Sequence, residues 1–131
     1  MSKRWIHSRT TVYNLGYHLI WRPKYRRKVL VDEVEHRLRE LLYEKAETIN
    51  VTIESLEVMP DHLHLFVKTP PTASPHWVVQ QLKGYTSRVM RQEYPQLKWM
   101  PTLWTRSYYA ESCGHISEDT VKRYIEDQKG Q

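Results

Sequence analysis

The sequence predicts an α+β fold in which a four-stranded antiparallel sheet carries helices on one face. Two observations lead to this prediction. Apolar residues recur at every second position in some segments and at every third or fourth position in others. These strand-like and helix-like segments follow in the order strand, helix, strand, strand, helix, strand, which is the order of a ferredoxin-like βαββαβ unit. A further helical segment after the last strand adds one C-terminal helix to that unit.

The first half of the chain supplies a strand, a helix and a hairpin. Residues Thr10–Trp21 alternate between the two sides of a half-buried strand. Apolar positions within Val31–Asn50 recur at the spacing of an amphipathic helix. The turn residues Pro60-Asp61 then separate two strand-like segments, Val51–Met59 and His62–Thr69, which we expect to pair as antiparallel neighbours.

The second half adds a helix, a strand and a final helix. Ser74 and Pro75 supply the N-cap and the first-turn proline of a helix that should end near Tyr94-Pro95. The segment Leu103–Ser112 is rich in aromatic and hydroxyl side chains, and we expect it to be the fourth strand. Ser117 caps a short terminal helix, one face of which presents Val121, Tyr124, Ile125 and Gln128.

Length and composition indicate one domain, residues 1–131, with a single core. The apolar runs fall far short of the ~20 residues that a membrane-spanning helix needs. The N-terminus lacks the features of a secretory signal, so we expect a cytoplasmic protein. Cys113 is the lone cysteine, which excludes an internal disulfide. Lysine and arginine total 20 against 15 acidic residues, a net charge of +5 that favours a polyanionic partner.

Basic and aromatic side chains are interleaved just after the first predicted strand. Cations contact phosphates and aromatic rings stack on unpaired bases, so this mixture suits a single-stranded nucleic acid. A solvent-exposed basic loop without a ligand explains the same residues. The second predicted helix carries further cations that are open to the same two interpretations. The candidate DNA-binding residues are Arg22, Lys24, Tyr25, Arg26, Arg27, Lys83 and Arg88.

Two histidines form the most informative candidate site. His62 and His64 occupy alternate positions of a predicted strand, so they project from the same face. Their attachment points lie about 6.6 Å apart, within reach of one divalent cation. The apolar residues that alternate with them should face the helices, which leaves the histidines on the open face. Asp61 either orients a histidine or serves the turn, and the turn is the favoured interpretation. His18 is interpreted as a structural histidine.

Two histidines are an incomplete ligand set, so a further ligand must come from elsewhere in the chain. The terminal helix offers a candidate, because Tyr124 and Gln128 are four residues apart and therefore neighbours on one helical face. They would present a phenol and an amide oxygen side by side. Taken alone, Tyr124 is explained better by packing with Val121 and Ile125. Together with the histidine pair, it becomes a candidate nucleophile.

Three motifs carry a resemblance to a known family. They are MPDHLH at residues 59–64, YHLIWRPKY at residues 17–25 and YIEDQ at residues 124–128. In content and order these motifs resemble the single-tyrosine transposases of the HUH superfamily, named for histidine-hydrophobic-histidine. The REP-associated tyrosine transposases are close relatives of that group. The resemblance covers nearly the whole chain.

The resemblance implies a ferredoxin-like homodimer that acts on single-stranded DNA whose ends fold into hairpins. It assigns metal binding to His62, His64 and Gln128, and the catalytic nucleophile to Tyr124. The tyrosine helix of one subunit can complete the active site of the other in such dimers. The implied cofactor is a divalent metal, Mg²⁺ or Mn²⁺, that polarises the scissile phosphate. Attack by the tyrosine would leave a 5′-phosphotyrosine and a free 3′-hydroxyl.

Three alternatives stay open at this point. A domesticated relative with the same chemistry would process repeated chromosomal palindromes. A non-catalytic module would bind single-stranded nucleic acid on an exposed sheet, without a metal requirement or covalent attachment. A two-histidine phosphoesterase would need paired His-X-Ser/Thr motifs; His115-Ile116-Ser117 fits that pattern once, whereas residues 62–64 lack the hydroxyl.

Overall fold

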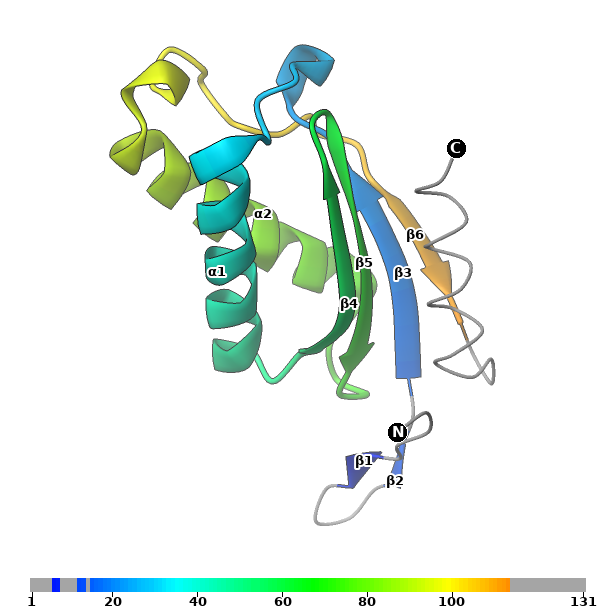
Figure 1. The fold of residues 1–131 in the computed structure, drawn as a ribbon. Coiled ribbons are helices and arrows are strands. Elements are labelled where there is room, and N and C mark those ends of the chain that lie inside the picture. Colours follow the sequence, from blue (N-terminus) through cyan, green and yellow to red (C-terminus); the bar gives the residue numbers. More distant parts are fainter. Residues whose placement is uncertain (1–5, 8–11, 14, 114–131) are drawn as a thin grey trace.

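The computed structural model confirms the predicted α+β architecture (Figure 1). It describes residues 6–7, 12–13 and 15–113. The main sheet and the two helices that pack on it are formed, in chain order, by β3 (Leu15–Trp21), α1 (Asp32–Thr48), β4 (Thr52–Met59), β5 (His62–Thr69), α2 (Pro75–Glu93) and β6 (Tyr109–Ser112). Shorter elements are the strands β1 (Ile6–His7) and β2 (Val12–Tyr13) and the 3-10 helices η1 (Lys24–Arg26) and η2 (Pro95–Leu97).

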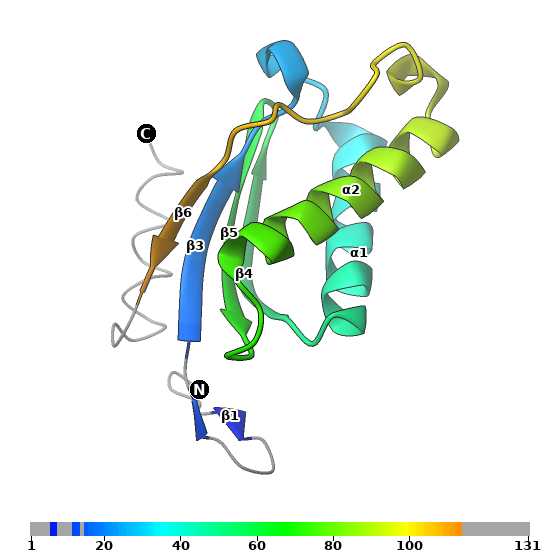
Figure 2. The ribbon, with the colours of Figure 1, turned by 180° about the vertical axis from the view of Figure 1, so that it is seen from behind.

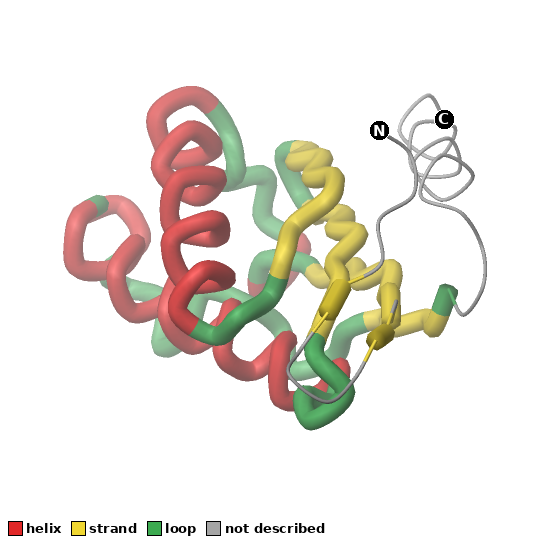
Figure 3. The backbone as a smooth tube through the Cα atoms, turned by 90° about the horizontal axis from the view of Figure 1, so that it is seen from below, coloured by secondary structure: helices red, strands yellow, loops and turns green. Residues whose placement is uncertain are grey.

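The sheet has the strand order of a ferredoxin-like fold. Its order is β4-β5-β3-β6, and each neighbouring pair is antiparallel. Figure 3 shows two layers, with the helices on one side of the sheet. Figure 2, seen from behind, shows α2 in the foreground, in front of the strands. As a result β3 and β5 lie side by side at the centre, although the helix α1 and the strand β4 separate them in the sequence.

The core lies between the sheet and the two helices. Leu63, Leu65 and Val67 on β5 belong to the buried cluster, as the alternation of this strand predicts. The aromatic rings of Trp21 and Trp104 meet edge to face, with centroids 6.0 Å apart. On the helix side, the Ser74 hydroxyl accepts a hydrogen bond from the Trp77 N–H at the start of α2, so the predicted N-cap is confirmed.

Two predicted strands are shorter than expected. The strand predicted over residues 10–21 begins at Leu15, because Val12–Tyr13 pairs with β1 in a different sheet. The strand predicted over residues 103–112 is reduced to β6, because the Trp104 indole turns into the core and donates to the Thr86 hydroxyl at 2.9 Å. Pairing with β3 therefore starts only at Tyr109, and all four residues of β6 are exposed.

The predicted terminal helix at residues 117–128 lies outside the described residues. Within the part of the chain that the structure describes, neither α1 nor α2 combines the length and the apolar character that a membrane-spanning helix requires.

Replacement of a central core side chain tests this arrangement. Leu65 is fully buried, so Leu65→Ala should lower the free energy of unfolding by about 2–5 kcal/mol through lost burial and a residual cavity. The exposed Glu47 on α1 is the control, and Glu47→Ala should change the same quantity by no more than about 0.5 kcal/mol. Urea unfolding followed by circular dichroism measures both. Equal effects of the two substitutions would contradict the assignment of Leu65 to the core.

Candidate active site

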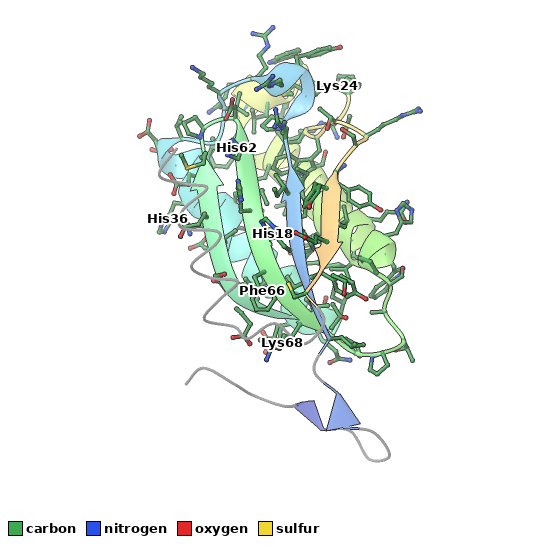
Figure 4. The ribbon with its side chains drawn as sticks, turned by 90° about the vertical axis from the view of Figure 1, so that its right-hand side faces the viewer. His18, Lys24, His36, His62, Phe66 and Lys68 are labelled. Atoms are coloured by element: carbon green, nitrogen blue, oxygen red, sulfur yellow. The ribbon has the colours of Figure 1, made fainter. Side chains whose placement is uncertain are left out.

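The two predicted site histidines lie together on the sheet face that α1 and α2 do not cover. Figure 4 looks onto this face, on which His18, His62 and Phe66 are labelled. The ring centroids of His62 and His64 are 5.0 Å apart, with their planes inclined by 56°. Alternation along β5 thus gives the two imidazoles a common space on one face.

Asp61 orients the first of these rings. Its carboxylate oxygen Oδ1 lies 2.8 Å from Nδ1 of His62 and accepts a hydrogen bond from it. The same bond holds the pKa of the Asp61 carboxyl below its ordinary value. A carboxylate can only accept, so the His62 hydrogen resides on Nδ1 and the remaining ring nitrogen is Nε2. Asp61 therefore orients His62, and it also lies in the turn between β4 and β5, so both interpretations of this residue hold.

His64 makes its Nδ1 contact with another histidine. Nε2 of His18 on β3 lies 3.4 Å from Nδ1 of His64, and the ring centroids are 5.5 Å apart. The two side chains are buried, with exposed fractions of 1% for His18 and 5% for His64. Burial, together with the neighbouring His62 and His18, lowers the pKa of His64 to about 4. The ring is therefore neutral at neutral pH, which is the state that a metal ligand must have.

The rest of this face is less open than the sequence predicts. Phe66 and Lys68 continue along β5 beside His64, and both are buried. Phe66 covers Gly16 on β3, where an added Cβ atom would lie 2.8 Å from the phenyl ring. The centre of the predicted open face is thus filled by side chains.

The basic segment after β3 adjoins the histidine pair. The Leu30 N–H donates to the carbonyl oxygen of Pro60 at 3.0 Å, which ties the end of this segment to the turn before His62. The positive charge of Arg22 contributes to the lowered pKa of His64. In the same way Arg26 contributes to the lowered pKa of Asp61. Two of the cations predicted to bind DNA, Arg22 and Arg26, therefore act electrostatically on the candidate site.

The turn within this segment is strained. Tyr25 and Arg26 have φ values of 62° and 52°, in the left-handed region that residues other than glycine rarely adopt. The Lys24 N–H donates to the Leu103 carbonyl at 2.8 Å and anchors the turn. The Tyr25 side chain is 65% exposed. Backbone strain of this kind clusters at functional sites, and here it presents an aromatic ring to solvent.

A second exposed aromatic group, which the sequence patterns do not reveal, lies beside the basic segment. Trp99 is 56% exposed, and the guanidinium of Arg27 lies over its ring at 5.3 Å from the centroid. Trp99 follows η2 in a connecting segment, so no strand or helix periodicity distinguished it. The signal available in the sequence was a tryptophan beside the cation Lys98, in a segment bounded by Pro95 and Pro101.

The remaining predicted site residues, Tyr124 and Gln128, lie outside the described residues. Within residues 6–7, 12–13 and 15–113, no group of three or more His, Cys, Asp or Glu side chains has the geometry to hold a metal ion. The two oriented imidazoles are thus the part of the predicted ligand set that the structure describes.

The sequence matches a known family over most of its length. Residues 11–128 fit the family described as "Transposase IS200 like". The chain belongs to the IS200-like transposase family. This finding bears out the resemblance that the three motifs suggested, and it makes DNA the substrate of the protein.

Curated relatives of this transposase belong to insertion sequences. The ISDra2 transposase TnpA of Deinococcus radiodurans is 42% identical over 121 residues, which are 89% of this chain and 86% of the relative. The transposase for insertion sequence element IS200 of Salmonella typhimurium is 30% identical over 125 residues, which are 91% of this chain and 82% of the relative.

Solved structures show the same fold. A Deinococcus radiodurans protein assigned as a transposase superimposes with a TM-score of 0.77 at 38% identity, over 94% of this chain and 97% of that one. A REP-associated tyrosine transposase bound to a REP hairpin superimposes with a TM-score of 0.61 at 10% identity, over 94% of this chain and 66% of that one. The second similarity concerns the fold alone.

Lys83 and Arg88 of the transposase, both predicted to bind DNA, differ in their surroundings. The Lys83 ammonium donates to the carbonyl oxygens of residues 105, 106 and 107 at 2.5, 3.3 and 3.4 Å. Burial lowers the pKa of this lysine. Arg88 is exposed and lies over the Tyr85 ring at 5.5 Å. Lys83 thus has a structural role in holding the loop before β6, while DNA contact by either residue stays a prediction.

Substitution of these two residues separates the roles. Lys83→Met should lower the free energy of unfolding by about 1–3 kcal/mol, because the carbonyls of the loop lose a charged donor. Arg88→Met removes the same charge from an exposed position of the same helix and should change this free energy by at most about 0.5 kcal/mol. Urea unfolding measures both. If Lys83→Met is as mild as Arg88→Met, the ammonium does not support the loop.

Proposed function

We propose that this IS200-like transposase cleaves and rejoins single-stranded DNA at the hairpin-bearing ends of its element. One observation carries the proposal: His62 and His64 are each oriented through Nδ1, and their rings share one space beside a basic, strained turn. Such a site can hold a cation next to a phosphate. The reaction is a transesterification in which Tyr124 is the nucleophile.

The residues of the site fit the implied metal. His62 and His64 use Nδ1 for contacts within the protein, so Nε2 is the nitrogen that each offers as a ligand. Gln128 would add an amide oxygen, and water or phosphate oxygens would complete the shell, as Mg²⁺ or Mn²⁺ prefers. When bound, the metal supplies Lewis-acid polarisation of the scissile phosphate.

The covalent step makes and breaks bonds only in the tyrosine and the DNA strand. The Tyr124 phenol oxygen forms a bond to phosphorus, and the bond between phosphorus and the 3′ oxygen breaks. The products are a 5′-phosphotyrosine and a free 3′-hydroxyl, which in net terms takes up the phenol proton. A 3′-hydroxyl can later attack the phosphotyrosine and regenerate the phenol, so the strand is rejoined without ATP. A phenol has an ordinary pKa of about 10, and Tyr124 therefore needs an environment that favours its ionised form.

The basic turn supports a single-stranded rather than a double-stranded substrate. Tyr25 and Trp99 expose aromatic rings on which unpaired bases can stack. Arg22, Arg26 and Arg27 are exposed cations that can contact phosphates of the same strand. Because Arg22 and Arg26 act electrostatically on the site, a strand bound along this turn would bring a phosphate toward the histidines.

We further propose that residues 1–131 fold as one domain and that the active form is a homodimer with composite active sites, in which Tyr124 of one subunit serves the histidines of the other. The chain is similar to insertion-sequence transposases along most of their length. This similarity favours a transposase that moves its own element, rather than a domesticated nuclease that acts on chromosomal palindromes.

A covalent-adduct experiment tests the nucleophile. Purified protein incubated with labelled single-stranded hairpin DNA and Mg²⁺ or Mn²⁺ should form an adduct that survives denaturation, and Tyr124→Phe should abolish it. The control is Tyr109→Phe, since Tyr109 on β6 is an exposed phenol whose ring lies 6.0 Å from that of His18. This variant should retain adduct formation.

Three results would contradict the proposal. An adduct that persists in Tyr124→Phe but vanishes in Tyr109→Phe would move the nucleophile to β6. Tight hairpin binding without an adduct at any metal concentration would identify a binding module. An adduct that forms equally well after removal of divalent metal with a chelator would exclude the proposed role of the cation.

The contribution of the basic turn is measurable from the salt dependence of binding. Arg26→Gln should weaken binding of single-stranded DNA and reduce the slope of log K against log salt by about 0.7, the value for one lost phosphate contact. Arg39→Gln on α1 is the matched control, because it removes the same charge from a guanidinium that is already paired with Glu35. Fluorescence anisotropy in the Tyr124→Phe background, in which no cleavage is expected, gives both slopes. Equal slopes for the two variants would remove Arg26 from the DNA contact.

A further inference from the structure

We propose that His18 is a positioning residue that selects the tautomer of His64. In this assignment Nε2 of His18 accepts a hydrogen bond from Nδ1–H of His64, which leaves Nε2 of His64 unprotonated and able to bind a cation. The inference deepens the proposed metal-assisted function and rests on it for its biological purpose. It assigns His18 no contact with DNA or metal.

The geometry of the central strands carries this inference. β3 and β5 are adjacent, with Ile20 opposite His64 and His18 opposite Phe66, so His18 is the diagonal neighbour of His64. The two nitrogens that face each other, His18 Nε2 and His64 Nδ1, are 3.4 Å apart. Both rings are buried, so water does not readily replace this contact.

A single hydrogen decides the state of the pair. Two neutral imidazoles share one hydrogen across such a contact, and it belongs either to His64 Nδ1 or to His18 Nε2. If it belonged to His18, the hydrogen of His64 would reside on Nε2, and that nitrogen would have no lone pair for a cation. The ligand role of His64 therefore requires His18 to be the acceptor.

His62 is held in the same way as His64, through a hydrogen bond at Nδ1, but by a different partner. Nδ1 of His62 donates to the Asp61 carboxylate, which has no hydrogen to give back. The partner of His64 is the His18 imidazole, which can either accept or donate the hydrogen bond. The two ligand rings are thus held through the same nitrogen, one by a fixed acceptor and the other by an adjustable one. Partners of ligand histidines commonly set ring orientation in this way.

Nitrogen NMR of the metal-free, full-length protein tests the proposal directly. With ¹⁵N-labelled histidine, the His64 signals can be assigned by their loss in His64→Asn. The wild type should carry its His64 hydrogen on Nδ1. His18→Phe removes the acceptor and should shift His64 toward the Nε2–H tautomer, whereas His18→Gln offers an amide oxygen and should restore the Nδ1–H form in part.

Metal affinity provides a second readout that does not depend on catalysis. Mn²⁺ binding followed by electron paramagnetic resonance should weaken by about 10-fold or more in His18→Phe, the usual effect of losing a partner of a ligand histidine. His18→Gln should lie between His18→Phe and the wild type. Thermal unfolding of each metal-free variant establishes that it is folded.

Three results would overturn the proposal. The first is a wild-type His64 that carries its hydrogen on Nε2, a measurement that needs no His18 variant to fold. The second is a folded His18→Phe protein with unchanged tautomer and unchanged Mn²⁺ affinity. The third is a loss of Mn²⁺ affinity with an unchanged metal-free tautomer, which would make His18 a direct ligand. Absence of a DNA adduct in the wild type, with the expected tautomer shift, would count against the proposed function and leave the positioning role intact.

Discussion

The alternation of side chains along β5 is the constraint on which the rest of this transposase depends. Leu63 and Leu65 are fully buried against the helices, and the histidines that alternate with them are forced to the opposite face. A slip of the strand by one residue would place imidazoles in the core and leucines in the site. The burial of two leucines therefore fixes the direction in which two candidate metal ligands point.

Hydrogen bonds and electrostatic effects from three parts of the chain then define the site on that face. The turn before β5 contributes Asp61, the central strand β3 contributes His18, and the segment after β3 contributes the cations Arg22 and Arg26. Each interaction is polar or electrostatic and acts on an imidazole or on its partner. The hydrophobic core sets where the rings are, whereas these polar neighbours set their orientation and their charge state.

Local signals in the sequence were sufficient for the fold and for the histidine pair. The hairpin strand His62–Thr69 and the Ser74 cap were predicted correctly, because a turn, an alternation and a cap are properties of neighbouring residues. The contacts of His18 and Lys83 and the inward turn of Trp104 were not predicted, since they depend on packing between distant segments. The contact between His18 and His64 could nevertheless have been predicted, because a ferredoxin-like strand order places the first and third strands of the unit side by side.

Gly16 and Phe66 have a consequence for how this protein can vary. The phenyl ring occupies the space that any side chain at position 16 would need, so a larger residue there requires a smaller one at position 66. Phe66 also pairs in register with His18, and a smaller residue would loosen the packing beside that imidazole. Residues 16 and 66 are therefore expected to covary among homologues. A homologue that changes only one of them should first loosen the packing around its equivalents of His18 and His64, while its fold is retained.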